Sequence, residues 1–514
     1  MSEPTDGGDP NLVAPQQTSG ERRSRRQFRQ EVASGLAWTL IGTWGRQGID
    51  LVVFLVLARL LMPEDIGLVA LAMVFVLFAQ LIVDQGMGDA LVQRREITPI
   101  QVDTAFWVAV LTGGLLTVLL FLFAGPISAL LAAPGLQPIL QVLSPTFLAA
   151  ALITIQIALL RRQLAFRSLS LRALAASAGG GVVGVVMALA GMGVWALVGQ
   201  QIASTVFSVL TLWWVTPWRP SFRASRAAFG GLFRFGIHVM AGDVITFMTR
   251  NVDNLLVGAV LGTSTLGFYV VGYRILTATQ AVLVQITRKM TFPVFSRLQE
   301  DPERMRRAYN RVTAAAAAVI LPGYVALAIV AGELIVVLFG ARWEQSGPVA
   351  MVLLLVGPVV AVQALSIALL NAVGRPDVAF RLRLLTTVAT VIGFVVAVPF
   401  GIVAVAAAYV VPAYLLLPLN LFWMRRHAGI QIAEYLGNMR GVAAATAVMA
   451  AVMLASRMVL GDREPLVVVA TLVPAGAAVF LAMLWLLDRE LIRDVLKIAA
   501  QANPLARRRV EQVR

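Results

Sequence analysis

The chain contains no cysteine and only two histidines among its 514 residues. The absence of cysteine excludes disulfide bonds, thiolate metal sites and cysteine nucleophiles. The histidines, His238 and His427, are too few and too far apart in sequence to suggest a zinc site. No GxxxxGK[ST] motif occurs, so the sequence gives no sign of an ATP-hydrolysing module. We therefore expect neither a metal nor a cofactor.

Charged residues are also scarce. They make up 13% of the chain, against 59% hydrophobic residues, whereas soluble domains carry about a quarter charged residues. This balance predicts a polytopic membrane protein. The formal net charge of +15 would by itself be compatible with nucleic-acid binding, but membrane proteins concentrate arginine and lysine in their cytoplasmic loops. Most basic residues here fall in alternate connections between apolar segments, so we expect a lipid bilayer and no nucleic acid as partner.

Long apolar segments dominate the sequence. With about 20 residues needed for each crossing, it predicts an all-α integral membrane protein with about fourteen transmembrane helices. The distribution of basic residues places both termini in the cytoplasm. The predicted helices cover approximately residues 34–60, 66–86, 101–124, 138–160, 171–191, 194–216, 232–261, 265–287, 309–331, 348–371, 378–399, 402–424, 440–459 and 466–487.

An internal repeat predicts two lobes. The segment LVGAVLGTSTLGFY from Leu256 echoes LARLLMPEDIGL from Leu57, which aligns Gly267 with Gly67. Six crossings separate the two copies, so they point the same way and form a parallel repeat about an axis normal to the membrane. The predicted organisation is a disordered basic tail (1–33), a first lobe of six helices (34–216), a basic linker (217–231), a second lobe of six helices (232–424), two further helices (425–487) and a second basic tail (488–514).

Several ionisable residues lie within the predicted spans. Each charge at mid-depth costs about 2.5 to 3.5 kcal/mol on insertion scales, so such residues need a partner or a polar cavity. Arg46 and Asp50 are four residues apart and share a helical face, which lets them pair. Arg250 with Asp253, followed by Arg274, occupies the related part of the second half. These groups either form ion pairs that ease insertion or line a substrate cavity.

Two further carboxylates are candidates for coupling to an ion or proton. Asp84 lies near the cytoplasmic end of the second predicted helix, where a capped carboxylate is the simpler interpretation. Asp243 precedes Arg250 on the same helical face and could be a structural partner of it. Gly179, Gly181 and Gly184 fit GxGxxG, but they lie in an apolar helix without a βαβ context, so they predict close helix packing.

Several short motifs occur in an order that resembles one family. They are LARLLMPEDIGL, Asp84-Gln85-Gly86, ALVQRRE from Ala90, FW at Phe106, LLRRQLAF from Leu159, VDNLLVGAVLG from Val252 and LGFYVVGYR from Leu266. Together they cover roughly residues 34–310. In these motifs the chain resembles Wzx-type polysaccharide flippases of the colanic-acid exporter-like branch, within the multidrug/oligosaccharidyl-lipid/polysaccharide exporter superfamily.

The resemblance implies two lobes around a central cavity with alternating access. The implied substrate is an undecaprenyl-pyrophosphate-linked oligosaccharide, flipped across the bacterial inner (cytoplasmic) membrane for exopolysaccharide or lipopolysaccharide assembly. A polymerase and other assembly proteins are implied partners. Arginine can grip phosphate oxygens with two hydrogen bonds, so we expect Arg46, Arg250 and Arg274 to bind the headgroup. Asp50 and Asp253 would hold the guanidinium groups when the site is empty.

Two other functions fit a polytopic protein. A drug or cation antiporter of the same superfamily would favour carboxylates without accompanying arginines. A membrane polysaccharide polymerase would need a large outer loop, whereas the longest predicted outer connection covers only about residues 332–347. We therefore expect a carrier and not an enzyme.

Overall fold

The computed structural model describes residues 19–94, 96–296, 302–461 and 463–493, and within these ranges the chain is helical, with no strand. The predicted all-α class is confirmed for this part. Eleven helical stretches are long and apolar enough to cross a membrane, by length and composition.

A short connection at residues 216–225 divides the helices into a first half and a second half of the chain. The first half contains α1 (Ser19–Leu60), α2 (Pro63–Asp84), α3 (Met87–Gln93), α4 (Pro99–Leu130), α5 (Leu136–Leu143), α6 (Pro145–Arg162), α7 (Phe166–Leu189) and α8 (Val194–Val215). The second half contains α9 (Arg226–Val260), α10 (Thr263–Ser296), α11 (Pro302–Ile329), α12 (Ala331–Phe339), η1 (Ala341–Trp343), α13 (Ser346–Leu354), α14 (Gly357–Ala372), α15 (Pro376–Ala397), η2 (Val398–Phe400), α16 (Ile402–Leu415), α17 (Leu417–Ala428), α18 (Ile432–Leu460) and α19 (Pro465–Leu487).

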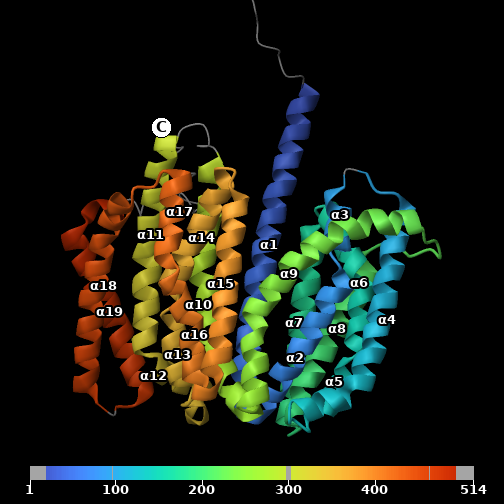
Figure 1. The fold of residues 1–514 in the computed structure, drawn as a ribbon, viewed down its shortest axis with the longest axis horizontal. Coiled ribbons are helices and arrows are strands. Elements are labelled where there is room, and N and C mark those ends of the chain that lie inside the picture. The colour runs from blue at the N-terminus through green and yellow to red at the C-terminus, as the bar shows by residue number, and fades with distance from the viewer. Residues whose placement is uncertain (1–18, 95, 297–301, 462, 494–514) are drawn as a thin grey trace, which may run out of the picture.

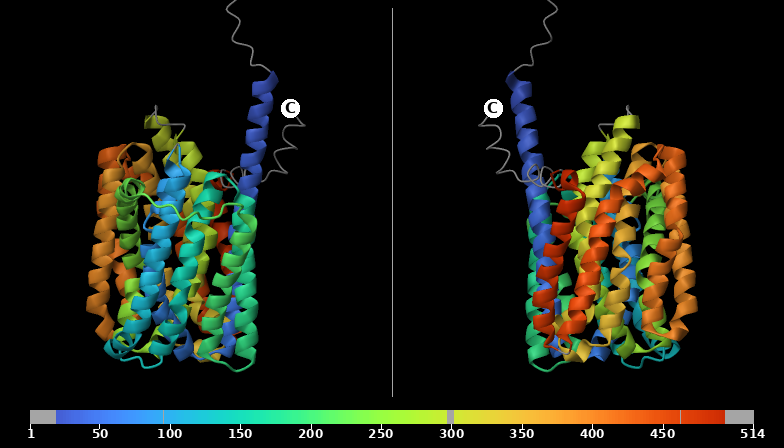
Figure 2. Two further views of the ribbon diagram at one scale, coloured as in Figure 1. Left: turned by 90° about the vertical axis from the view of Figure 1, so that its right-hand side faces the viewer. Right: turned by 90° about the vertical axis from the view of Figure 1, so that its left-hand side faces the viewer.

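The long helices run side by side in two groups (Figure 1). Helices α2 to α8 form one group and α10 to α19 form the other, and α1 packs on α7 of the first group. Figure 2 shows that the long helices are nearly parallel and that the first turns of α1 extend beyond the rest. We call the end of the bundle toward which α1 extends the basic end, because the connections after α3, α6 and α14 bring Arg94, Arg162 and Arg375 there. The other end is called the far end.

Three predicted helices are each divided in two. Residues 138–160 are covered by α5 and α6, residues 348–371 by α13 and α14, and residues 402–424 by α16 and α17. The second piece of each pair carries a proline within its first two residues, namely Pro145, Pro358 and Pro418. Proline has no N–H to donate to the preceding turn but fits the start of a helix, so it divides each stretch there.

Several predicted helix boundaries differ from the structure by six residues or more, and two of these differences alter the predicted tail and linker. Helix α1 begins at Ser19, inside the segment predicted as a disordered tail, because lengthening an existing helix is far easier than nucleating one. Helix α9 begins at Arg226, so the predicted linker 217–231 ends at Ser225, whose side chain accepts a hydrogen bond from the Ala228 N–H at 3.4 Å. Residues 1–18 and 494–514, which include most of the second predicted tail, lie outside the described part.

Helix α9 connects the two groups. Near its start the Arg94 side chain donates a hydrogen bond to the Gly231 carbonyl at 2.8 Å. A Cβ on Gly236 would lie 2.2 Å from the Gln85 carbonyl oxygen, so the backbones touch. Farther along, the Thr249 hydroxyl lies 2.9 Å from that of Thr387 on α15. The start of α9 thus packs on the first group and its later turns pack on the second (Figure 1).

The repeated motifs meet at the far end. A Cβ on Gly67 in α2 would lie 1.7 Å from the Thr263 carbonyl oxygen, and one on Gly267 in α10 would lie 1.9 Å from the Pro63 carbonyl oxygen. The two contacts are reciprocal, as expected for two copies related by a pseudo-twofold axis. Only glycine allows the backbones of α2 and α10 to approach this closely.

The glycine run in α7 also mediates close packing, as its sequence predicts. A Cβ on Gly180 would lie 2.7 Å from the Gln200 carbonyl oxygen on α8, and one on Gly184 would lie 2.8 Å from the Gln200 Cβ. Helices α7 and α8 therefore form a tight antiparallel pair.

We expect Gly67→Ala to destabilise the protein because the added methyl group collides with a backbone carbonyl that cannot rotate away. Overpacking of this kind costs at least about 1 to 3 kcal/mol. The measurement is the thermal unfolding midpoint of the purified protein in detergent. Gly114→Ala is the matched control, since nothing lies within 4 Å of a Cβ on Gly114 in α4. Equal midpoints for the two variants would contradict the close contact.

Candidate functional site

The end of α1 is capped by residues of the second half. The Trp343 indole N–H donates to the Ala58 carbonyl at 2.7 Å, and the Arg342 guanidinium donates to the Leu61 carbonyl at 2.9 Å. The last carbonyls of a helix have no partner within it, so these bonds satisfy groups that would otherwise be unpaired. Trp343 is fully buried.

Arg59 of α1 in turn donates two hydrogen bonds to the second half. Its guanidinium donates to the carbonyls of Val337 and Leu338 on α12, at 2.7 and 3.0 Å. Together with the contact between Gly67 and Gly267, these bonds hold the two halves against each other at the far end.

A cavity of about 320 Å³ with a partly polar lining lies in the first half beside α10, and we call it the inter-lobe cavity because Arg274 of the second half completes its lining. The Arg274 guanidinium of α10 reaches α1 there: it donates to the backbone carbonyl of Asp50 at 3.2 Å and lies 4.9 Å from the ring centre of Phe54. Arg274 thus brings a positive charge from the second half into contact with the first. The cavity is lined by Asp50, Phe54, Val69, Met73, Leu197, Gln200, Gln201 and Arg274.

The predicted pairing of Arg46 with Asp50 is not present. The Asp50 carboxylate instead accepts a hydrogen bond from the Ser177 hydroxyl of α7 at 2.5 Å, and the Arg46 side chain is exposed. No ion pair of Arg46 occurs within the described ranges. Four-residue spacing places both side chains on one face, but a hydroxyl on a neighbouring helix offers the carboxylate a closer partner.

The predicted pairing of Arg250 with Asp253 is also absent. Asp253 is 1% exposed, and its carboxylate accepts hydrogen bonds from the Tyr269 hydroxyl at 2.8 Å and the Asn254 N–H at 2.9 Å. A separation of three residues turns two helical side chains about 60° apart. Asp253 therefore points into the protein core toward Tyr269, whereas Arg250 does not.

Arg250 lines a different cavity, of about 220 Å³, which we call the second-lobe cavity. Arg250 and Arg274 therefore do not converge on one chamber in this structure. The second-lobe cavity is lined by Thr246, Thr249, Arg250, Val356, Gln363, Ile367, Leu382, Arg383, Thr386, Thr387, Thr390, Tyr409, Ala413 and Asn420.

Asp84 lines a third cavity, of about 320 Å³, between α2, α6 and α8, which we call the first-lobe cavity. Its other lining residues include Asp89, whose carboxylate lies 3.5 Å from the Arg161 guanidinium. Asp243 is exposed on α9 and does not line it. The sequence reasoning missed the contribution of α8, where Gln201, Ser204, Thr205 and Ser208 line this cavity. Their spacing of three and four residues in an otherwise apolar helix is a detectable signal.

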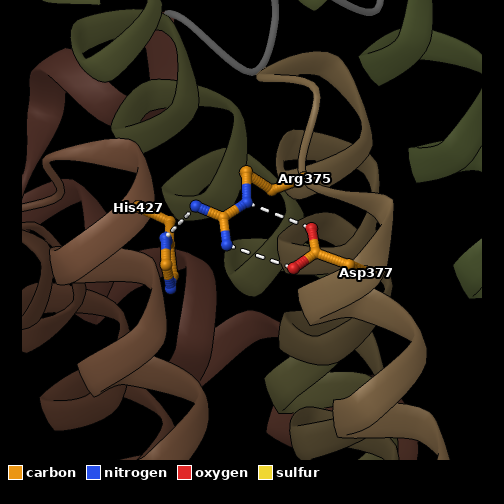
Figure 3. A network of polar contacts seen from close by, with 3 residues as sticks. All are labelled: Arg375, Asp377 and His427. Carbon is orange, nitrogen blue, oxygen red and sulfur yellow. Dashed lines mark hydrogen bonds and ion pairs between the residues drawn. The ribbon is translucent and has the colours of Figure 1, made fainter.

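The two histidines do not suggest a metal site. The His427 Nδ1 lies 3.0 Å from the Arg375 guanidinium, which also bonds both oxygens of Asp377 at 3.0 and 3.1 Å (Figure 3). This network joins the end of α17 to the turn before α15. The side chain of His238 lies outside the described part. Within that part, no group of three or more histidine, aspartate or glutamate residues could hold a metal ion.

Residues 56–348, more than half of the chain, match the family described as polysaccharide biosynthesis protein. The chain belongs to this family. It is 26% identical to the lipopolysaccharide biosynthesis protein WzxC of Escherichia coli over 70% of this chain and 74% of that protein. It is 28% identical to the succinoglycan biosynthesis transport protein ExoT of Rhizobium meliloti, over 70% of this chain and 73% of that protein.

The fold is that of a solved flippase. The structure superposes on the lipid II flippase MurJ, in an inward closed conformation, with a TM-score of 0.71 at 14% identity, covering 88% of this chain and 99% of MurJ. With eleven stretches able to span a membrane, the family member described here is a multi-pass membrane protein. The predicted resemblance to polysaccharide flippases is confirmed.

We expect Trp343→Phe to lower the thermal unfolding midpoint. The ring can still pack, but the Ala58 carbonyl loses its donor, and an unsatisfied buried group costs about 1 to 3 kcal/mol. Trp214→Phe is the control because Trp214 is 87% exposed. Circular dichroism of both variants in detergent measures the difference, and unchanged melting of Trp343→Phe would argue against the capping role.

Proposed function

We propose that this protein is a flippase that carries an undecaprenyl-pyrophosphate-linked oligosaccharide from the cytoplasmic to the periplasmic leaflet of a bacterial inner membrane. The observation that carries the proposal is Arg274, a cation that the second half contributes to a partly polar cavity otherwise lined by the first half. Membership of a polysaccharide biosynthesis family, with relatives named as transport proteins, supports it.

The chemistry of such a substrate requires this kind of cavity. Its lipid tail can stay in the bilayer, but an unsolvated anionic headgroup costs tens of kcal/mol in a medium of low dielectric constant. Arginine stays charged and can bind two phosphate oxygens at once. In this proposal the pyrophosphate replaces the Asp50 carbonyl as the partner of Arg274. No step breaks or forms a covalent bond, so the protein is a carrier and not an enzyme.

The arrangement of the halves suggests a direction of access. Positively charged connections favour the cytoplasmic side, so the basic end faces the cytoplasm and the closed far end faces the periplasm. If α9, α10 and the pair α13 and α14 also cross the membrane, the eleven spans become fourteen. Opening then requires the contact between Gly67 and Gly267 to separate.

Other predicted site residues keep proposed roles. Arg46 lies one turn from Asp50 and could receive the headgroup before Arg274. Arg250 could bind the headgroup only after the second-lobe cavity joins the inter-lobe cavity. Asp253 is a structural residue that Tyr269 anchors. Asp84 stays a candidate for ion coupling because it lines a cavity, and Asp243, which is exposed, is a weaker one.

A drug or cation antiporter is the second candidate function. The observation that favours it is Asp84, a carboxylate of the first-lobe cavity that, unlike Asp89, forms no ion pair among the described residues. The two functions differ in the phenotype of a deletion. A flippase defect removes surface polysaccharide and accumulates lipid-linked repeat units, whereas an antiporter defect changes drug tolerance.

We expect Arg274→Gln to reduce export strongly. Loss of a hydrogen bond to a charged group costs about 1.5 to 3 kcal/mol, which corresponds to a decrease of roughly 10- to 150-fold. Arg274→Lys keeps the charge without the planar fork and should show an intermediate loss. Surface polysaccharide is measured in a deletion strain that expresses each variant at equal protein level.

Arg223→Gln is the control because Arg223 is exposed in the connection before α9. We expect it to export normally. Normal export by Arg274→Gln at equal protein level would overturn the assignment of Arg274 to the headgroup.

We also expect the membrane potential to drive transport. A headgroup with about two negative charges gains about 2.3 kcal/mol per charge for each 100 mV when it moves out of a negative interior. In reconstituted vesicles, a valinomycin-imposed potential that is negative on the cytoplasmic side should therefore accelerate flipping, and the reversed potential should slow it. Equal rates under both potentials would rule out direct electrical driving.

A further inference from the structure

In the function proposed so far, the first-lobe cavity contributes only Asp84, the candidate for ion coupling. It lies between α2, α6 and α8 and measures about 320 Å³. Gln201 lines both this cavity and the inter-lobe cavity that contains Arg274. The two cavities therefore adjoin at Gln201, and a ligand bound at Arg274 could extend past this residue into the first lobe.

Several polar side chains of the first-lobe cavity have no hydrogen-bond partner in the part of the chain that the structure describes. Among the described residues, none forms a hydrogen bond with the side chains of Gln80, Gln201, Ser204 or Ser208. The hydroxyl of Thr205 differs, because it donates to the carbonyl of Gln201 one turn earlier, at 2.9 Å. Polar groups in a membrane-spanning helix are unfavourable without a partner. These four side chains are therefore available to a polar ligand or to water.

The charges in this cavity select which part of a headgroup fits. Asp84, Asp89 and Arg161 together give this cavity a formal net charge of about −1, because Arg161 pairs with Asp89, so it disfavours a pyrophosphate. A carboxylate can accept hydrogen bonds from two neighbouring sugar hydroxyls. Amide and hydroxyl side chains can both donate to and accept from a sugar. The pyrophosphate is instead attracted to Arg274 on the other side of Gln201. The chemistry thus separates the two parts of a glycolipid headgroup between neighbouring cavities.

We propose that the first-lobe cavity is a subsite for the sugars next to the pyrophosphate, bound chiefly by Gln80, Asp84, Gln201, Ser204 and Ser208. This inference rests on the proposed flippase function and adds where the glycan lies. The volume is at the lower end of the range of about 300 to 1,000 Å³ for ligand pockets. It therefore suits the first sugars of the repeat unit, and the remainder extends beyond it.

The absence of cysteine makes a direct test possible. Ser204→Cys places a single thiol in the first-lobe cavity, and Gln200→Cys places one in the inter-lobe cavity. Thr246→Cys, in the second-lobe cavity, is the control. Each full-length variant is purified in detergent, and its rate of reaction with a maleimide is measured alone, with undecaprenyl pyrophosphate, and with lipid-linked oligosaccharide extracted from cells that encode this chain.

We expect the glycolipid to slow labelling of Ser204→Cys about tenfold at a concentration about ten times its Kd, and the bare carrier to leave the rate unchanged. Gln200→Cys should be protected by both lipids, and Thr246→Cys by neither. Adding Arg274→Gln should weaken protection by both lipids.

The three cysteine variants distinguish failure of the glycan subsite from failure of the proposed flippase function. If both lipids protect Gln200→Cys but the glycolipid leaves Ser204→Cys unprotected, the glycan subsite is wrong and the flippase proposal stands. Equal protection of Ser204→Cys by the bare carrier also overturns the subsite, since no sugar is then needed. If neither lipid protects Gln200→Cys, the proposed function fails together with the subsite.

Discussion

The close backbone contact between α2 and α10 is the constraint on which the rest of the architecture depends. Gly67 and Gly267 let each helix touch a carbonyl at the start of the other. This contact fixes the far end, and the caps from Arg342 and Trp343 to the end of α1 extend it. Because α1 and α10 are held there, Arg274 of α10 can reach the backbone of Asp50 on α1.

Several of the intramembrane polar residues have the partners that a membrane environment favours. Charged and amide side chains inside a bilayer must face another helix or a cavity. Asp253 satisfies this rule through Tyr269, and Asp50 satisfies it through Ser177. Arg274, Gln200 and Gln201 face the inter-lobe cavity instead. Some intramembrane charges are therefore structural, whereas others are available to a ligand, and their burial and partners distinguish the two kinds.

Helix α9 shows how a helix can belong to two lobes. Sequence periodicity places it in the second lobe from residue 232, but its first turns bond to α3 and contact the residues that follow α2. Its later turns contact α15, where the hydroxyl of Thr249 lies 2.9 Å from that of Thr387, so one helix is attached to both lobes. In the proposed flippase, alternating access would have to bend α9 or slide it on the first lobe.

The sequence by itself determined the all-helical class, the close packing along the α7 glycines and the family, because segment length, composition and local motifs are properties of neighbouring residues. The sequence also contains Pro145, Pro358 and Pro418, which divide three of the spans. Only the tertiary structure decided which side chains form hydrogen bonds with the buried carboxylates. Helical spacing shows which face carries Asp50 or Asp253, but not which hydroxyl from another helix will meet it. The separation of Arg250 from Arg274 into different cavities has the same cause: it depends on how whole helices pack.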